Sequence, residues 1–457
     1  MRNADGRAAH SPLSTALQSY RAVLGHRDFA LLWAGQTVSW FGDSLYLVAL
    51  LWLVQEMTGS RVLMGVVAAC RTIPALFGFA AGVFVDRLDR RRLMIAADLL
   101  RAGIVVAVPL LLAAGWLAPW HLPVIAFLLA VAGVPFYPAQ QALLPALVDR
   151  SELAHANSLM TLSQQVLNAI GYGVGGICIA LVGVGPLFAI DALTFVVSGL
   201  AVLSMRLTST AARSPAGGGA MAAGGSQGAP GSTRWRRWSE DLRAGLRFVR
   251  AQPALVAVIP LVMLLSFLVA PFAVLLPAWV QDVLGAGPET FGMLETSITV
   301  GMVLGSLVVG VLAARARRST MVLGSLVVFG AGALAFAFSR SAGVSALVLA
   351  IMGCANTVVN VIFVTWVQGI VPAAMMGRVF GALGTVSQAV APLGQALAGI
   401  AGHALALPLV FGGVGVVLVG VSAIYAATPA LRGAFNLIEA DLLRATDQAD
   451  GGPVGVA

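Results

Sequence analysis

The sequence predicts an all-α membrane protein with twelve transmembrane helices, and three observations indicate that fold class. Only 10% of the residues are charged and 59% are hydrophobic, with a mean hydropathy of +0.92, whereas a soluble domain carries roughly 25% charged residues. Apolar runs of about 20 residues, the length that crosses a bilayer, recur along the chain. Most of the remaining charges fall between those runs rather than inside them.

The apolar runs divide into two sets of six. Read by length and hydropathy, they cover approximately residues 29–55, 62–85, 93–115, 121–146, 156–183 and 187–206, and then 254–281, 290–314, 320–339, 343–368, 378–402 and 405–427. We therefore expect a tail, a six-helix half, a linker, a second six-helix half and a second tail, at residues 1–28, 29–206, 207–253, 254–427 and 428–457.

The distribution of arginine predicts the orientation in the membrane. All 27 basic residues are arginine, and the net charge is +8. The loops on the same side as the N-terminus carry Arg87, Arg90, Arg91, Arg92, Arg150, Arg315, Arg317, Arg318 and Arg378, and the opposite loops carry only Arg61 and Arg340. Positive charge accumulates on the cytoplasmic side, so both termini are expected there. The same bias accounts for the basic pI, and no nucleic-acid partner is expected.

The linker changes character along its length. Residues 211–233 are rich in Ala, Gly and Ser and predict a flexible connection. Residues 234–250 then place Trp235, Trp238, Leu242, Leu246 and Val249 at helical spacing with arginines between them, which predicts an amphipathic helix on membrane lipids. A similar helix is expected after the last span, with Leu431, Phe435, Ile438 and Leu442 on one face.

One short loop carries a recognisable pattern. Residues 82–93 read Gly-Val-Phe-Val-Asp-Arg-Leu-Asp-Arg-Arg-Arg-Leu, and four arginines are too costly to place inside a bilayer. The loop resembles the Gly-x-x-x-Asp-Arg-x-Gly-Arg-Arg loop of the major facilitator superfamily, with Asp89 in place of Gly, as in the branch of enterobactin exporters and macrolide efflux pumps. The resemblance implies a gating role for the loop and for the nearby Asp98 and Arg101, which can bond at i and i+3: Gly82, Asp86, Arg87, Arg90, Arg91, Asp98 and Arg101.

Further motifs extend the resemblance over roughly residues 26–430. Residues 138–145 read Pro-Ala-Gln-Gln-Ala-Leu-Leu-Pro, like the fourth helix of that branch, and Gly171, Gly175 and Gly176 lie in a pattern like the exporters' fifth helix, with Tyr172 in place of Pro. The resemblance implies a proton-coupled exporter of amphiphilic small molecules such as drugs, antibiotics or siderophores, working by alternating access. An uptake, facilitative or lipid transporter remains an alternative, and a non-transporting scaffold or sensor a more remote one.

Ionisable residues inside the spans are the candidates for proton coupling, because they are costly there and face the interior of the bundle. Asp43 and Arg71 lie at similar depth on the first two spans and can pair, either permanently or in only one conformation. Coupling through Asp43 requires that the pair break in one state, since a neighbouring arginine opposes protonation. The candidates are Asp43, Arg71, Asp191 and Glu295.

Amides within the spans are candidates for lining a cavity, although they also link helices: Gln36, Gln164, Gln165, Asn168, Asn356, Asn360 and Gln388. Three scattered cysteines do not form a disulfide or metal pattern. No nucleotide loop or catalytic triad is recognisable. We therefore expect a monomeric carrier with no metal, no cofactor and no enzymatic activity.

Overall fold

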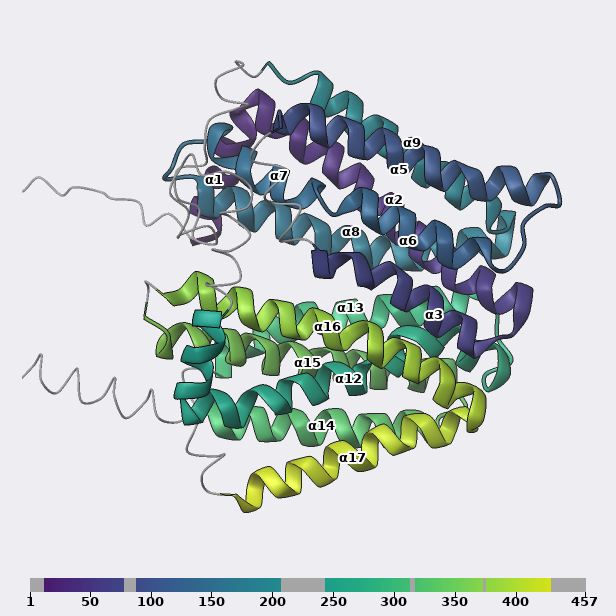
Figure 1. Cartoon of the computed structure of the whole chain (residues 1–457), viewed down its shortest axis with the longest axis vertical. Coiled ribbons are helices and arrows are strands. Elements are labelled where there is room, and N and C mark those ends of the chain that lie inside the picture. Colours follow the sequence, from purple (N-terminus) through teal and green to yellow (C-terminus); the bar gives the residue numbers. More distant parts are fainter. Residues whose placement is uncertain (1–11, 78–87, 207–242, 313–316, 373–374, 429–457) are drawn as a thin grey trace, which may run out of the picture.

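The computed structural model describes residues 12–77, 88–206, 243–312, 317–372 and 375–428. Within these ranges the secondary structure is helical, with no strand. The chain forms two halves that lie side by side (Figure 1). The all-α fold predicted from the sequence is therefore confirmed for the part of the chain described.

Among its described residues, the first half has seven α-helices after a short surface helix, α1 (Pro12–Gly25). In chain order they are α2 (Arg27–Thr58), α3 (Arg61–Thr72), α5 (Arg90–Ala113), α6 (His121–Gly133), α7 (Phe136–Leu143), α8 (Leu153–Val182) and α9 (Gly185–Leu203). Two single turns of 3-10 helix extend α3 and α7, at Ile73–Phe77 and Leu144–Ala146.

The second half contains six long helices. They are α12 (Pro253–Asp282), α13 (Pro288–Leu312), α14 (Arg318–Phe338), α15 (Ala342–Ile370), α16 (Met376–Ala404) and α17 (Leu407–Ala427). A helix at residues 243–251 precedes α12. α12 remains one continuous helix although it contains Pro260, Pro271 and Pro277.

Within the described residues, ten helical segments are long and apolar enough to cross a membrane. The other two predicted spans differ for identifiable reasons. α3 and its 3-10 extension stop at Phe77, where the described segment ends, and α16 has 29 residues but is less apolar than the ten. The fourth predicted span is interrupted between α6 and α7 at Val134-Pro135, since proline lacks the N–H that would continue the helix.

Short turns fix the position of the helix ends. α2 ends at Gly59, whose φ of 58° is accessible to glycine, and Ser60 then caps α3 by accepting a hydrogen bond from the Leu63 amide at 3.2 Å. The turn places Arg61 at the first position of α3. That end of the bundle, which also contains the end of α12 and the start of α13, is called here the opposite end.

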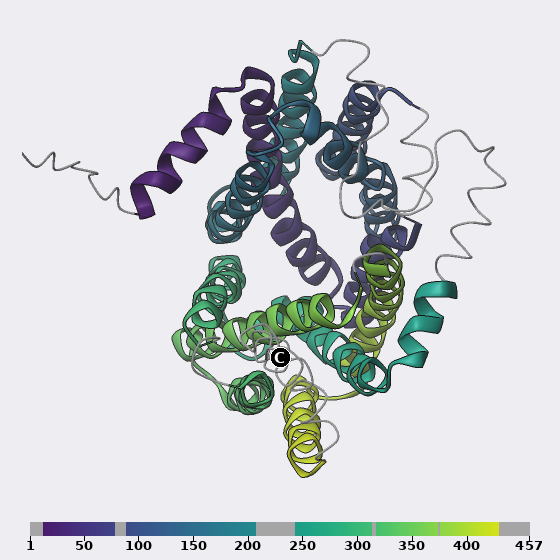
Figure 2. The same cartoon turned by 90° about the vertical axis from the view of Figure 1, so that its left-hand side faces the viewer.

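The other end is called the α1 end, because α1 lies there together with the 243–251 helix. Figure 2, which faces this end, shows the two short helices on opposite sides of the molecule, each next to its own half. Each half therefore begins with a surface helix. The sequence predicted only the second, although Leu13, Leu17, Tyr20 and Leu24 of α1 also recur at helical spacing.

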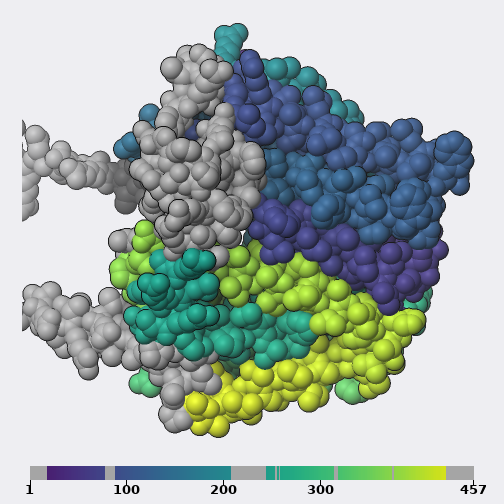
Figure 3. All heavy atoms as spheres, viewed as in Figure 1, coloured from purple at the N-terminus to yellow at the C-terminus, as the bar shows by residue number. Residues whose placement is uncertain are grey.

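The two halves meet through two pairs of helices. The principal contacts between halves are made by α8 with α13 and by α3 with α16, and the second pair can be followed along the seam in Figure 3. The second and fifth membrane helices of one half thus face the fifth and second of the other. This exchange is expected of two internal repeats related by a pseudo-two-fold axis.

Candidate functional site

A cavity of about 600 Å³ lies inside the first half. Helices α2, α3, α5, α6, α7 and α8 all contribute to its wall. Its wall is partly aromatic, through Trp40, Tyr46, Tyr137 and Tyr172, and it contains three charged side chains: Asp43, Arg71 and Arg101. A cavity of this size with a few polar groups on an aromatic wall is suited to a small amphiphilic molecule.

Asp43 and Arg71 both face this cavity but do not touch. Asp43 is partly exposed and Arg71 is exposed, and the two side chains interact electrostatically. Among the ion pairs of the described residues, none joins Asp43 to Arg71, so the direct pair expected from their depth is not formed in this conformation. Arg71 also interacts electrostatically with Glu295 on α13, in the other half. One guanidinium therefore lies in the field of an acid from each half.

Arg101 is held by the residues around it. It hydrogen-bonds the fully buried Asp98 on the same helix, and its guanidinium lies over the rings of Phe136 and Phe195, at 4.6 and 4.3 Å from their centroids. Cation–π contacts of this kind stabilise an arginine that is largely removed from water. The remainder of the guanidinium lines the cavity, where it interacts electrostatically with Asp43.

Asp191 on α9 packs against Gly42 of α2 and interacts electrostatically with Asp43. It is fully buried, one carboxylate oxygen accepts a hydrogen bond from Thr194 at 3.5 Å, and the other has no hydrogen-bond partner among the described residues. The close approach depends on Gly42, since a Cβ there would lie 2.6 Å from the Asp191 oxygen. Two carboxyl groups, Asp43 and Asp191, therefore share the field of Arg101.

The predicted amides separate into three groups. Gln164 and Asn168 line the cavity. Gln36 is buried and donates a hydrogen bond to Ser198 at 3.0 Å, so it links α2 to α9. The others do not line this cavity: Gln165 on α8, and Asn356, Asn360 and Gln388 in the second half.

The opposite end is closed by glycine contacts between the halves. Gly176 of α8 faces Gly292 of α13, and Gly65 of α3 faces Gly399 of α16. At each contact a Cβ on one glycine would lie 2.9 Å from the Cα of the other. The same contact thus occurs twice, once in each pair of helices that joins the halves. The neighbouring Gly171 and Gly175 face α2 instead.

Two further contacts reinforce this closure. Arg61 forms an ion pair with Asp282 at 2.8 Å and donates a hydrogen bond to the Gly402 carbonyl at 2.6 Å, joining α3 to α12 and α16. The Trp52 ring stacks on Phe291 with centroids 6.2 Å apart, joining α2 to α13. Sequence reasoning missed all of these pairs, because their members are more than 100 residues apart.

The described arginines of the predicted gating loop lie at the α1 end. Gly82, Asp86 and Arg87 are outside the described residues. Arg90 donates a hydrogen bond to the Ala142 carbonyl at 3.0 Å, and Arg91 donates to the carbonyls of Val202, at 3.1 Å, and Leu203. Both arginines therefore bind the C-terminal ends of helices, where positive charge is favourable. Their gating role stays a prediction.

Asp89, which replaces the Gly of the family pattern, has a local structural role. Its side chain accepts a hydrogen bond from the Arg92 amide at 3.1 Å and caps the N-terminus of α5. The cap offsets the unfavourable placement of three arginines at a helix N-terminus.

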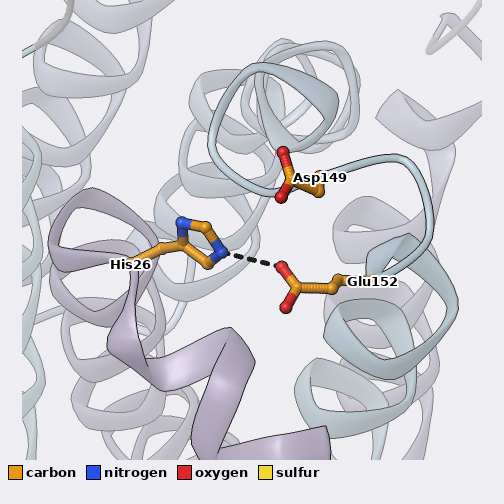
Figure 4. Close-up of side chains that lie close together, drawn as sticks. All are labelled: His26, Asp149 and Glu152. Carbon is orange, nitrogen blue, oxygen red and sulfur yellow. Dashed lines mark hydrogen bonds and ion pairs between the residues drawn. The ribbon is translucent and has the colours of Figure 1, made fainter.

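A second polar cluster lies at the corner between α1 and α2. Figure 4 shows His26 bonded to Glu152 at 2.7 Å, with Asp149 beside them. One ligand atom from each residue lies within 4.8 Å of the others, which is the spacing of a loose metal site. The His26–Glu152 bond itself joins the start of α2 to the start of α8.

The chain matches the family described as transmembrane secretion effectors, a branch of the major facilitator superfamily, over residues 18–457. It belongs to that family. Among curated relatives of this secretion-effector family, the multidrug efflux pump Tap of Mycolicibacterium fortuitum is 29% identical over 392 residues, covering 84% of this chain and 90% of Tap. Macrolide efflux protein A of Streptococcus pyogenes is 23% identical over 378 residues, covering 81% of this chain and 88% of the relative.

The solved structure of the nucleoside transporter NupG has the same fold. Its TM-score is 0.67 at 14% sequence identity, and the match covers 90% of this chain and 98% of NupG. The secretion-effector family and its bacterial relatives support an efflux transporter of small molecules in the plasma membrane. The superfamily resemblance predicted from the sequence is confirmed.

Proposed function

We propose that this protein is a proton-driven antiporter that exports amphiphilic small molecules, such as drugs, antibiotics or siderophores, from the cytoplasm by alternating access. The observation that carries the proposal is the cavity of the first half, which both Asp43 and Arg71 line without forming an ion pair. Both termini are cytoplasmic in this proposal, because the described arginines concentrate at the α1 end and only Arg61 and Arg340 lie at the opposite end.

The conformation described here is then the one that takes up substrate from the cytoplasm. Closure by the glycine pairs at the opposite end supports this assignment, since one side of the carrier must be sealed while the other is open. The aromatic wall binds the apolar body of the substrate, and Gln164 and Asn168 supply hydrogen bonds that orient it.

Coupling follows from the competition for Arg71. Asp43 and Glu295 both interact with this guanidinium, one from each half, and a single arginine neutralises only one of them at short range. Movement of the halves transfers Arg71 between the two acids. Asp43 binds a proton when Arg71 pairs with Glu295, and the return of Arg71 to Asp43 releases that proton on the other side, while Glu295 serves as the alternative partner of Arg71 and exchanges no proton.

Replacement of Asp43 tests this scheme. The Asp43→Asn protein is expected to lose export of a fluorescent cationic dye against its gradient, because the carrier of the proton is gone. It is expected to retain exchange of dye across vesicles with no proton gradient, because the cavity is intact. Glu56→Gln is the matched control, since Glu56 is an exposed acid on the same helix, and it is expected to export normally.

The outcomes separate the parts of the proposal. Wild-type export that persists when a protonophore removes the gradient contradicts proton coupling. Loss of both export and exchange in Asp43→Asn, with normal insertion, makes Asp43 a substrate-binding residue instead. Wild-type protein that moves dye in neither assay contradicts export of amphiphilic cations. In this proposal the protein works as a monomer without cofactor, and it is a carrier rather than an enzyme.

A further inference from the structure

The helix at residues 243–251 packs on the surface of the second half. It lies across the α1 end beside α12 and α16 (Figures 1 and 2). A Cβ on Gly245 would lie 2.9 Å from the carbonyl carbon of Arg378, and Val249 is 8% exposed. Gly245 and Val249 therefore mark the face that packs on the start of α16.

The other face of the helix carries three arginines. Arg243, Arg247 and Arg250 follow the i, i+4, i+7 spacing that places side chains on one face. All three are exposed, and none forms a hydrogen bond or an ion pair with any described residue. The 243–251 segment contains no acidic residue. Within the described residues 243–251, the result is a concentrated positive face with no acidic residue beside it.

The position of the helix sets the depth of this face. α12 begins at Pro253, two residues after the helix ends, and the apolar run of the sequence predicts that the span begins near residue 254. At ~1.5 Å per residue, about three residues separate the helix from the expected start of the span by roughly 5 Å, which is within the layer of the lipid headgroups. Exposed arginines at that depth meet phosphate groups before any other abundant anion.

The equivalent helix of the first half provides a contrast. α1 also precedes the first membrane helix of its half and lies at the same end, but it contains a single arginine, Arg21. A general requirement for positive charge on this side of the membrane would act on both helices alike. The arginine face is thus a property of the 243–251 helix and not of surface helices in general.

We propose that Arg243, Arg247 and Arg250 bind the headgroups of anionic phospholipids of the surrounding leaflet and thereby hold the start of α16 at the membrane surface. α16 contacts α3 through Gly399 near its other end. Bound lipid therefore stabilises one end of a helix whose other end helps to join the two halves. The proposal is independent of the transported substrate and of proton coupling.

The test is thermal unfolding of the purified full chain with and without anionic lipid. Phosphatidylglycerol added to phosphatidylcholine micelles or vesicles is expected to raise the midpoint of the wild type. Each arginine near an anionic surface strengthens association by roughly fivefold, so the triple variant Arg243→Gln/Arg247→Gln/Arg250→Gln is expected to lose about a hundredfold in affinity for the anionic lipid.

The matched control removes the same charge elsewhere at the α1 end. Arg21, Arg150 and Arg206 are exposed arginines of the first half, and their triple Gln variant is expected to respond to phosphatidylglycerol as the wild type does. If both triple variants lose the stabilisation by phosphatidylglycerol equally, the effect depends only on net charge, and the proposed binding site is wrong. The proposed site is also wrong if phosphatidylglycerol stabilises the Arg243→Gln/Arg247→Gln/Arg250→Gln variant as much as the wild type.

Inorganic phosphate distinguishes lipid from a soluble anion. At matched ionic strength, inorganic phosphate is expected to leave the thermal unfolding midpoint of the wild type unchanged, because the three arginines bind headgroups that are held together in a lipid surface. Stabilisation by inorganic phosphate equal to that by phosphatidylglycerol, and lost in the same variant, assigns the arginine face to a soluble phosphate ligand and overturns the lipid assignment.

Discussion

The two ends of the bundle are constructed differently. At the opposite end, the described contacts cross between the halves: two glycine pairs, the Arg61–Asp282 ion pair and the Trp52–Phe291 stack. At the α1 end, the described contacts of Arg90, Arg91 and Gly245 stay within one half. In this conformation these contacts join the halves at the opposite end. Deeper in the bundle, Thr72 donates a hydrogen bond to Gln395 at 2.7 Å and Thr296 donates one to the Ala169 carbonyl at 2.9 Å, which also join the halves.

The difference indicates which contacts break during transport and which persist. Contacts between halves at the opposite end must be lost when that end opens, whereas contacts within a half move with it as a rigid unit. Variants at the opposite end are thus expected to shift the balance of conformations. Variants at the α1 end are expected to change the stability of one half.

The largest effect is expected from filling a glycine contact. Gly176→Leu places a side chain against the backbone of Gly292, and overpacking of this kind costs about 1–3 kcal/mol. The equilibrium therefore shifts by roughly five- to 150-fold toward the conformation in which the opposite end is open. Labelling of a single cysteine introduced at Met57, in a variant without the three native cysteines, measures that opening.

The control for this experiment is Gly413→Leu on α17. A Cβ at Gly413 meets no atom within 4 Å. The cysteine introduced at Met57 is therefore expected to react as slowly in Gly413→Leu as in the protein without this change. Gly65→Leu, at the equivalent contact, is expected to behave like Gly176→Leu. Slow labelling in both Gly176→Leu and Gly65→Leu, with normal folding, would show that the glycine pairs do not maintain closure.

A smaller effect is expected from the ion pair. The side chains of Arg61 and Asp282 are 24% and 41% exposed, and exposed pairs contribute about 0.2–1 kcal/mol, so Asp282→Asn is expected to raise opening by no more than about fivefold. High salt is expected to produce the same change in the wild type and none in the variant. A salt response that survives in Asp282→Asn would assign the effect to other charges.

The smallest effect is expected at the α1 end. Arg91→Gln removes the positive charge that binds the carbonyls at the end of α9, a loss of about 0.3–1 kcal/mol, which lowers the unfolding midpoint by ~1–3 °C. Cysteine labelling at the opposite end is expected to stay unchanged. Faster labelling in Arg91→Gln would mean that Arg91 also helps to set the conformational balance, as the gating prediction implies.

Sequence patterns predicted the features that depend on neighbouring residues. Apolar runs predicted helices such as α2 and α17, and the i, i+3 spacing of Asp98 and Arg101 allowed the bond that the structure contains. The aromatic signature of a surface helix predicted the 243–251 segment, but Trp235, Trp238 and Leu242, and the second such helix at Leu431, Phe435, Ile438 and Leu442, lie outside the described residues.

Features that depend on the packing of distant segments were not predictable in this way. Depth along two helices allowed Asp43 and Arg71 to pair, but depth does not fix the rotation of each helix, and the two side chains line the cavity without forming an ion pair. The placement of Asp191 against Gly42 depends on how closely α9 approaches α2. Nothing in either segment alone specifies that approach.

The glycine pairs also bear on the permeability of the membrane. At Gly65–Gly399 and Gly176–Gly292 the two backbones lie too close for a methyl group to fit between them, and a water molecule needs comparable space. A continuous file of water would conduct ions and dissipate the electrical potential of the cell. Contact between bare backbones leaves no room for such a file at either glycine pair, so neither pair of helices that joins the halves offers ions a path between them at that depth.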